Sequence, residues 1–366
     1  MPRSIMRLKT PLEPLPPIRA SDKRVVRGPS SIGRPQHVSD VNQLAPFKYP
    51  WAWDTYLRAQ NNRWLPTEVG MGQDILTFKT KLSEADRHTY LNTLSFLSTA
   101  DIMAMRNIGL AIMEKVTAPE ITIYQSLQVQ EEGIHTWTYQ HCIESLNLDQ
   151  GEIYNRYRVI PEIHQKIAIA NERLHSVLRA DIDLTDRDSL HDFLMAYSFF
   201  AAVFEGAWFY NGFTPVFALA RRGLMTNTAE QFQYILRDEV EHAKFGINVV
   251  NEIVKEEGVA LDPKAFQQMW EECEAAEDDY IRYVLPVPMV GYSASQHIEQ
   301  FRYLANVRSR ALNMKEPFPG AQNILTWLEE MSGGTRKEKN FFETRVTEYQ
   351  SGGSLNWDDD PATPAP

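Results

Sequence analysis

Two short runs of the sequence combine a pair of neighbouring acids with a histidine that stands three residues after the second acid. They read Glu-Glu-Gly-Ile-His at 131–135 and Asp-Glu-Val-Glu-His at 238–242. Residues three apart lie on one face of a helix, so each run brings a carboxylate and an imidazole together. Such mixed ligands suit iron or manganese better than metals that prefer thiolates. The two pairs are Glu132 with His135 and Glu239 with His242.

A further acid precedes each run on a strongly apolar stretch, Asp101 before the first and Glu205 before the second. The order of a carboxylate and then Glu-x-x-His therefore occurs twice, which is the ligand set of a two-metal site inside a four-helix bundle. Acids are rarely buried without a partner, so four of them on apolar helices require a compensating cation. A single Glu-x-x-His is most often a surface pair, whereas two with preceding acids favour a metal site. The candidate ligands are Asp101, Glu132, His135, Glu205, Glu239 and His242.

The residues alone leave open which acid of each run faces the metals. Glu131 stands four residues before His135, and Asp238 stands four residues before His242. Spacings of three and four both place side chains on a common helix face. Either acid of each run could therefore be the ligand.

The elements that must carry these residues are helices. A capping-box pattern at Ser83 and Asp86 predicts a helix start, and a second one at Thr228 and Gln231 predicts the start of the helix that carries the second run. No convincing run of alternating strand residues occurs, so the fold class is all-α. The other helical stretches are expected at 120–147, 150–183, 189–222, 263–284 and 295–312.

The ends of the chain differ from its centre in composition. Residues 1–45 are rich in proline, arginine and serine, which predicts an extended or disordered N-terminal arm. Aromatic residues crowd 46–64, so that segment is expected to pack on the core. We expect one helical domain over 46–335 and a flexible C-terminal tail over 336–366.

Bulk composition excludes several classes of protein. The 366 residues are 43% hydrophobic, enough for a large core, and the net charge of −11 argues against broad binding to nucleic acid or membrane surfaces. Two cysteines, Cys142 and Cys273, make no disulfide framework in a chain of this length. No apolar run reaches the roughly 20 residues of a membrane span, and no secretory signal is present, so a cytoplasmic location is expected.

Two-metal bundles serve as iron stores, oxygenases, desaturases and radical generators, and the ligands do not choose among these. Other features resemble the radical-generating small (beta) subunit of class I ribonucleotide reductase, with a ferritin-like fold, over nearly all of residues 46–350. The segment Phe-Leu-Ser-Thr-Ala-Asp at 96–101 is similar to the first-ligand helix of that family, in which an aspartate replaces the usual glutamate. The resemblance also assigns the second acid of each run to the metals.

The resemblance implies roles for further residues. Tyr139, one helical turn after His135, matches the residue that stores the tyrosyl radical. Trp53 resembles the first tryptophan of the radical-transfer path, and Asp238, with Arg237 beside it, matches the acid that links this tryptophan to His135. Tyr349, in the segment 340–349, falls where the family has its interface tyrosine. The walls of the radical pocket are expected at Phe209, Phe213 and Ile235.

The implied function is to generate and store a tyrosyl radical with dioxygen and to pass it to the large (alpha) subunit, which reduces ribonucleotides to deoxyribonucleotides. Two iron ions per chain are expected, with manganese or a mixed pair as alternatives, together with a reductant protein and a homodimer. The chain has no glycine-rich phosphate loop, so nucleotide sites are assigned to the large subunit. The family's tail ends in apolar or aromatic residues, whereas this one ends Asp-Asp-Asp-Pro-Ala-Thr-Pro-Ala-Pro, leaving Leu355 and Trp357 as docking candidates.

Two other functions stay open at this point. A ligand-binding oxidase or monooxygenase on the same bundle needs a substrate cavity at the metals but neither Trp53 nor Tyr349. A metal-storage protein explains the ligands but not the aromatic residues or the acidic tail.

Overall fold

The computed structural model describes residues 48–116, 118–175 and 182–328. Within these ranges the chain is helical and forms no β-strand, only an isolated bridge between Met289 and Tyr292. The all-α prediction is confirmed. The principal helices are α1 Pro50–Ala59, α2 Gly72–Thr80, α3 Glu84–Asn107, α5 Pro119–Ser145, α6 Gln150–Val159, α7 Pro161–His175, α8 Arg187–Ser198, α10 Thr214–Ala220, α11 Thr226–Glu257, α12 Pro263–Val284 and α13 Ala294–Ala311. Shorter segments are the 3-10 turns η3 Gln60–Asn62 and η4 Pro66–Glu68, the π-helical η5 Ile108–Ile112 and η6 Phe199–Phe209, and the helical turns α4 Met113–Lys115 and α9 Tyr210–Gly212.

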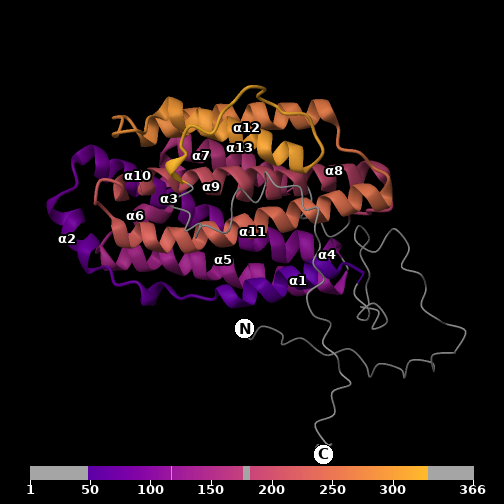
Figure 1. Cartoon of the computed structure of the whole chain (residues 1–366), viewed down its shortest axis with the longest axis horizontal. Coiled ribbons are helices and arrows are strands. Elements are labelled where there is room, and N and C mark those ends of the chain that lie inside the picture. Colours follow the sequence, from indigo (N-terminus) through magenta and orange to yellow (C-terminus); the bar gives the residue numbers. More distant parts are fainter. Residues whose placement is uncertain (1–47, 117, 176–181, 329–366) are drawn as a thin grey trace, which may run out of the picture.

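Four helical segments form the centre of the molecule and run along its long axis (Figure 1). The helix α3 packs against α5, α11 packs against the π-helical segment η6, and α11 also contacts α5. All four carry fully buried polar residues among their apolar ones. The candidate ligands are distributed over these four segments.

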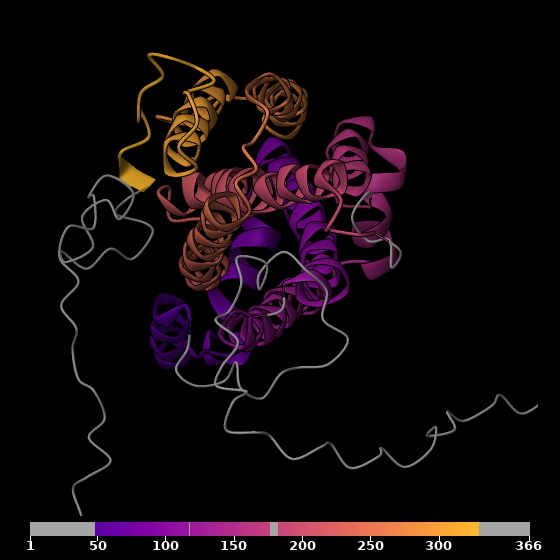
Figure 2. The ribbon, with the colours of Figure 1, turned by 90° about the vertical axis from the view of Figure 1, so that its right-hand side faces the viewer.

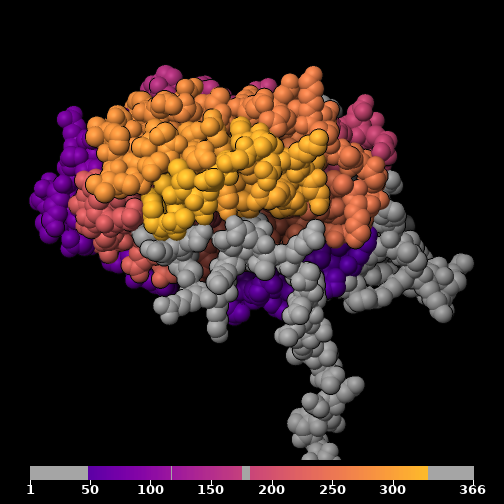
Figure 3. Space-filling model, turned by 45° about the horizontal axis from the view of Figure 1, so that its top comes forward, coloured from indigo at the N-terminus to yellow at the C-terminus, as the bar shows by residue number. Residues whose placement is uncertain are grey.

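The remaining helices cover this centre on opposite sides. Figure 2 shows α12 and α13 stacked on one side and α1 on the other, where α1 contacts α5 and α11. The segment that follows α13 spreads across the outer face of α12 and α13 (Figure 3). Backbone oxygens of this segment accept from both helices, Pro317 from Gln267 and Phe318 from Asn306. The outer layer thereby closes one flank of the four central segments.

The helices α3 and α11 begin in different ways. As predicted, α3 starts with a capping box, in which the side chains of Ser83 and Asp86 exchange hydrogen bonds with each other's backbone. The predicted capping box of α11 is wrong, because this helix begins at Thr226 and its Thr228 lies inside the first turn. Its free amides bond instead to Asp74 of α2, which accepts from the amides of Asn227 and Thr228. A carboxylate about 150 residues away in sequence thus replaces the local cap.

The segment η6 is π-helical over the stretch that contains Glu205. An extra residue per turn frees a backbone carbonyl, which requires a partner when buried. Arg308 of α13, 1% exposed, supplies it by donating from its Nε atom to the Gly206 oxygen at 2.9 Å. A side chain at position 206 has no room, because a Cβ atom would lie 2.8 Å from the Ala201 oxygen. This contact ties α13 to the turn that presents Glu205.

Two continuous helical stretches, Glu84–Lys115 and Arg187–Ala220, are long and apolar enough to cross a membrane by composition alone. They are the stretches that contain Asp101 and Glu205, both buried among the other central helices. Core helices of this kind pass the same test, so the finding is weak evidence for a membrane span.

Candidate metal centre

Six buried side chains meet at the centre of the bundle and form two overlapping groups. One group holds Asp101, Glu132, His135 and Glu239, and the other holds Glu132, Glu205, Glu239 and His242. Within each group the ligand atoms all lie within 4.8 Å of one another. Glu132 and Glu239 belong to both groups, so their carboxylates would be available to both metal positions. These are the six residues proposed as ligands in the sequence analysis.

Each of the four central segments contributes to the centre. Asp101 comes from α3, Glu205 from η6, and the two Glu-x-x-His pairs come from α5 and α11. All six side chains are at most 1% exposed. The centre is therefore closed to bulk solvent on every side that the described helices form.

The imidazoles resolve which acid of each run faces inward. The Nδ1 atom of His135 lies 3.1 Å from Glu239 and 3.4 Å from Asp101, and the Nδ1 atom of His242 lies 3.2 Å from Glu132. Their Nε2 atoms point away from the centre, that of His135 to Asp238 and that of His242 to Glu131. The second acid of each run therefore lines the centre, and the first contacts the outer nitrogen of the opposite histidine.

The polar atoms at the centre match what a metal pair requires. Both carboxylate oxygens of Asp101, Glu132 and Glu239 are buried without a hydrogen-bond partner. One oxygen of Glu205 and the Nδ1 atoms of both histidines are also buried without a hydrogen-bond partner. Buried polar atoms are almost always paired, so a cluster of orphaned oxygens and nitrogens that converge is suited to cations. The residues present thus fit a dinuclear metal site.

The electrostatics of the cluster lead to the same conclusion. Burial, reinforced by the neighbouring carboxylates, raises the pKa of Asp101 and Glu205 well above the usual range. Burial acts in the same direction on Glu132, but the nearby imidazoles of His135 and His242 outweigh it and lower its pKa to about 2. Carboxylates crowded in this way repel one another unless positive charge is added. Two divalent cations, when bound, would provide that charge and keep the acids ionised.

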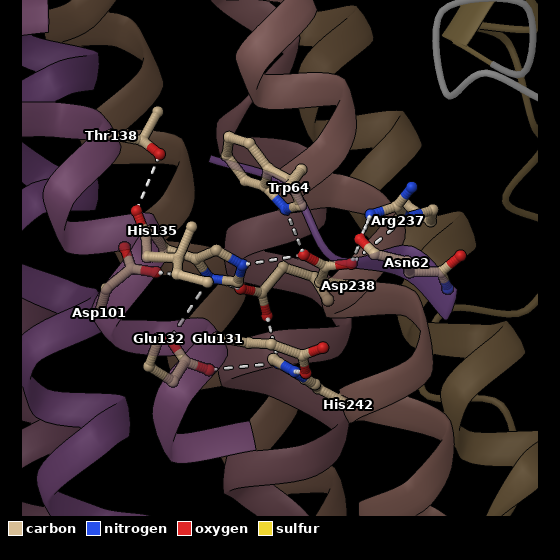
Figure 4. Close-up of polar contacts among 12 residues, drawn as sticks. Asn62, Trp64, Asp101, Glu131, Glu132, His135, Thr138, Arg237, Asp238 and His242 are labelled. Atoms are coloured by element: carbon tan, nitrogen blue, oxygen red, sulfur yellow. Dashed lines mark hydrogen bonds and ion pairs between the residues drawn. The ribbon is translucent and has the colours of Figure 1, made fainter. Parts of the chain in front are cut away.

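Beyond the inner ligands, the outer nitrogen of His135 leads to a polar chain (Figure 4). Asp238 accepts from the Nε2 atom of His135 at 3.4 Å and from the indole nitrogen of Trp64 at 2.9 Å. Arg237 pairs with the other oxygen of Asp238 and donates to the backbone oxygen of Asn62. Burial acts to raise the pKa of Asp238, but the contacts with His135 and Arg237 lower it overall. An ionised carboxylate therefore orients the imidazole.

The expected link between Asp238 and Trp53 is wrong, because the indole that bonds to Asp238 is that of Trp64. Trp53 lies on α1, only partly buried, and stacks on Tyr56 at 5.3 Å between ring centroids. The two tryptophans lie eleven residues apart in one aromatic segment. Only the fold distinguishes them, because Arg237 draws the segment at Asn62 towards α11 and places Trp64 over Asp238.

The outer nitrogen of His242 bonds to a residue for which the sequence suggested no role. His242 donates from Nε2 to Glu131 at 2.9 Å. Burial raises the pKa of Glu131, although the hydrogen bond from His242 opposes this. Gln128, one turn earlier on α5, donates its side-chain amide to Glu205 at 2.8 Å. The symmetry of the two runs was the signal that could have identified Glu131, since Asp238 holds the matching position.

Tyr139 lies on α5 one turn after His135, fully buried, and its hydroxyl has no hydrogen-bond partner. Burial and the charges of Asp101 and Glu239 raise the pKa of this phenol well above its usual value. The ring of Phe232 packs edge-on against the tyrosine ring at 5.7 Å and 83°. The phenol of Tyr139 is therefore protonated and uncharged, and it is buried beside the carboxylates.

The expected pocket residues Phe209, Phe213 and Ile235 are all fully buried. Phe213 packs against Phe232 at 5.4 Å, and so is one ring removed from Tyr139. Phe232 was not predicted, although it lies seven residues before Glu239 on the ligand face of α11. That Phe209 and Ile235 wall the pocket stays a prediction. Tyr349, the N-terminal arm and the C-terminal tail lie outside the described residues.

Known proteins are similar in sequence to this chain over most of its length. The family described as "Ribonucleotide reductase, small chain" matches residues 41–323. The beta subunit of ribonucleoside-diphosphate reductase from Chlamydia pneumoniae is 39% identical over 323 residues, which cover 87% of this chain and 92% of the relative. The small subunit from Dictyostelium discoideum is 29% identical over 85% of this chain and 86% of its own.

Solved structures agree with these relatives. The ribonucleotide reductase R2 subunit from Clostridium botulinum has a TM-score of 0.70 and 25% identity, covering 78% of this chain and 89% of its own. An R2-like ligand-binding oxidase with a Mn/Fe cofactor has a TM-score of 0.59 at 17% identity, with 75% of this chain and 99% of its own covered, and shows the fold alone. With its dinuclear site, its helical bundle and these relatives, the chain belongs to the small-chain family of ribonucleotide reductase, an oxidoreductase.

Proposed function

We propose that this chain generates a radical on Tyr139 and stores it there for use by a large subunit that reduces ribonucleotides. The observation that carries the proposal is the position of Tyr139, one turn from His135, fully buried, with a hydroxyl that has no partner. A radical survives only where no water or oxidisable group reaches it. The apolar rings around this phenol supply that environment.

The six ligands would hold the metals, Asp101 and His135 on one side, Glu205 and His242 on the other, and Glu132 and Glu239 between them. A redox-active metal pair supplies, when bound, the oxidising power of dioxygen at this site. Tyr139 would give one electron to that oxidant and its phenolic proton to a nearby carboxylate such as Asp101. We assign iron to both positions, with manganese as the alternative, because the carboxylate-rich set suits both. One structural relative is a dimanganese(II) protein from Streptococcus sanguinis and another carries a Mn/Fe cofactor.

The path out of the site begins with His135, Asp238 and Trp64. Their hydrogen bonds form a continuous chain from a metal ligand to a tryptophan that is 6% exposed. Arg237 keeps Asp238 ionised, so the acid holds both its imidazole and its indole partner in place. We assign to Trp64 the role first given to Trp53, and to Tyr349 in the tail the relay into the large subunit.

The assembly completes the proposal. We propose that residues 46–335 form the metal-binding domain, that 336–366 dock on the large subunit, and that 1–45 form an arm. Two copies of the chain form a homodimer, as in the Rnr4 homodimer from Saccharomyces cerevisiae. Dioxygen and a reductant protein serve the metal site, and the cytoplasm is the compartment. A ligand-binding oxidase has no need of the bonded chain from His135 to Trp64.

Replacement of the tyrosine tests the proposal. We expect Tyr139→Phe to bind metal as the unchanged protein does, yet to lose the radical signal in electron paramagnetic resonance and most ribonucleotide reduction with the large subunit. The matched control is Tyr280→Phe, because Tyr280 is also fully buried with an unpartnered hydroxyl but lies on α12. Normal reduction by Tyr139→Phe contradicts the proposal. Tyr349→Phe should keep the stored radical and stop reduction in the complex.

A further inference from the structure

An exposed apolar turn joins α12 to α13 at one end of these two helices (Figure 1). The segment 286–291 reads Pro-Val-Pro-Met-Val-Gly, and all of its residues except Met289 are exposed. Val290 is 88% exposed, the highest value among the large apolar residues of the described chain, and Val287 is 57% exposed. Single apolar side chains are common on protein surfaces, but several in one short turn indicate a contact surface.

The turn is held in one conformation from both ends. At its entry, the Thr89 hydroxyl donates to the Val284 backbone oxygen at 2.8 Å. At its exit, Met289 and Tyr292 exchange two backbone hydrogen bonds around Gly291, whose φ of +71° favours glycine. Two prolines restrict the backbone further. An apolar surface that is already rigid loses little conformational entropy when a partner covers it.

A buried polar chain fixes Tyr292 beneath the turn. Lys166 of α7 pairs with one oxygen of Glu277 at 2.6 Å, and the other oxygen lies 2.6 Å from Nε2 of His297. Because a carboxylate only accepts, His297 carries its hydrogen on Nε2, and its Nδ1 atom accepts from the Tyr292 hydroxyl at 2.7 Å. All four residues are fully buried. The exposed turn is therefore anchored to the interior of the protein.

Arg221 adds a positive charge beside the turn. Its Nη1 atom would lie 3.3 Å from a Cβ atom at Gly291, and its guanidinium covers the ring of Trp327 at 4.5 Å. Within the described ranges no carboxylate forms an ion pair with Arg221, whereas the neighbouring Arg222 is paired with Asp86. The surface at the turn thus combines exposed apolar side chains with one unbalanced positive charge.

The end of the chain has the complementary composition. Residues 355–360 read Leu-Asn-Trp-Asp-Asp-Asp, two apolar residues followed by three acids. The tail also starts beside the turn, because Trp327 packs edge-on against Tyr292 at 6.3 Å between centroids and the described residues end at 328. The connecting residues 329–354 can span roughly 30 Å as a random coil, so they are long enough to return 355–360 to the turn.

We propose that residues 355–360 of the tail dock on the turn at 286–291 of the same chain. The Trp357 ring would cover the exposed valines, and the three aspartates would lie towards Arg221. Because the two segments share one chain, their effective concentration is on the order of 1 mM, which populates a contact too weak to form between separate molecules.

The consequence is regulatory, and this part rests on the proposed function. Leu355 and Trp357 are also the candidates for docking on the large subunit. A tail held on the body of its own chain is not available to that partner, so the large subunit must displace the contact before it binds. The turn would thereby lower the affinity of the complex without touching the metal centre.

A spin label tests the contact in the full-length protein. Both native cysteines are buried, so a nitroxide attaches selectively to Ser295→Cys, an exposed position just after the turn. Fluorine-labelled tryptophan gives a resonance for Trp357, which Trp357→Phe assigns. We expect this resonance to be weaker with the nitroxide than with its diamagnetic analogue. Equal intensity with both labels overturns the proposal.

Two substitutions on the surface of the turn test its specificity. Arg221→Gln removes the unbalanced charge, and Val290→Asn removes the most exposed apolar side chain. We expect each to restore most of the lost Trp357 intensity. The matched control is Val159→Asn, because Val159 is also strongly exposed, at 77%, but lies at the end of α6. An equal effect of Val159→Asn and Val290→Asn overturns the assignment of the turn.

A mixed sample distinguishes the tail of the same chain from that of a second copy. One protein carries the nitroxide without fluorine, and the other carries fluorine without the nitroxide. We expect no loss of the Trp357 resonance in this mixture. A loss as large as in the doubly labelled protein shows that the tail docks on another copy, which overturns the proposal.

Binding of the large subunit tests the regulatory consequence separately. Release of the tail should lower the Kd for the large subunit by about two- to tenfold in Arg221→Gln and Val290→Asn, as measured by titration calorimetry. An unchanged Kd overturns the regulatory role, and a higher Kd shows that the turn itself binds the large subunit. The nitroxide measurement requires neither radical nor large subunit, so failure of the proposed function leaves the test of the contact intact.

Discussion

The two histidines of the metal centre have equivalent inner contacts and different outer ones. His135 and His242 each direct Nδ1 towards the shared glutamates and Nε2 towards the first acid of the opposite run. Asp238, on His135, also holds Trp64 and Arg237. No third residue is seen to bond to Glu131, which holds His242, within the described part of the chain.

This difference indicates that the inner ligands and the outer acids have separate roles. The inner ligands obey an approximate two-fold symmetry, because both metals need the same kind of oxygen and nitrogen atoms. The outer acids differ, because only one side continues through hydrogen bonds to a tryptophan. The pKa values follow the same division, lowered at Asp238 by His135 and Arg237 and raised at Glu131 by burial. Four experiments test this division.

The largest effect should come from the glutamates that both metal positions share. We expect Glu239→Ala to lose both metals, because its carboxylate belongs to both ligand groups. Asp101→Ala should weaken mainly one position, since Asp101 belongs to only one group. Elemental analysis after desalting measures the metals per chain. Retention of one tightly held metal by Glu239→Ala contradicts the assignment of a shared ligand.

The next effect concerns the tryptophan on Asp238. We expect Trp64→Phe to retain metals and stored radical but to lose most ribonucleotide reduction in the complex, because the indole donor disappears. Its unfolding free energy should fall by about 1.5–3 kcal/mol, the range for a hydrogen bond to a charged group. The control is Trp53→Phe, which removes a partly buried ring without this bond. Equal turnover losses in both variants would show that Trp64 has no special role.

A smaller effect should distinguish the two outer acids. Asp238→Asn and Glu131→Gln each keep the shape of the side chain and remove its charge. Loss of an outer partner typically weakens metal binding by about 10–100-fold, so we expect both variants to bind metal less tightly. Turnover at saturating metal should fall further in Asp238→Asn alone, because only Asp238 bonds to Trp64. Metal titrations and turnover assays with the large subunit measure the two quantities independently, and equal turnover in both variants contradicts the division.

The sequence predicted the parts of the centre that repeat and missed those that depend on distant contacts. The two acid-acid-x-x-His runs and the helix pattern follow from spacing, because they are local properties. The choice of the second acid in each run came from the family resemblance. The choice between Trp53 and Trp64 is not local, since Arg237 decides it by binding the backbone at Asn62. The start of α11 is likewise set by Asp74 of α2 rather than by Thr228.

The π-helical form of η6 was missed for a related reason. Its residues are apolar apart from Glu205, so they show no periodicity that distinguishes an α-helix from a π-helix. The extra residue is stabilised by Arg308, which lies on a helix 102 positions away and bonds to the Gly206 carbonyl. A contact between residues so far apart cannot be recognised in a single sequence. Gly206 is the only local sign of it, because a Cβ atom at this position has no room.

The smallest effect is expected at Asp86, in the capping box at the start of α3. It tests whether contacts far from the metal centre also distinguish its His135 side from its His242 side. Burial acts to raise the pKa of Asp86, but hydrogen bonds from Arg222 and Ser83 outweigh it and lower the pKa. A lowered pKa adds stability above the unfolded value of about 3.9, and this stability is lost as the pH falls through the folded value.

We therefore expect Asp86→Asn to lower the unfolding free energy near neutral pH by no more than about 1 kcal/mol, because the Arg222 partner is partly exposed and screened. The difference from the unchanged protein should shrink below about pH 4, where the carboxyl group becomes protonated in the unfolded chain and then in the folded one. Urea denaturation of metal-free protein at several pH values measures it. If the difference in unfolding free energy between the two proteins grows as the pH falls, the lowered pKa of Asp86 is contradicted. In a separate sample of Asp86→Asn loaded with metal, a changed metal content would show that the cap of α3 acts on Asp101 and that local contacts alone do not set the centre.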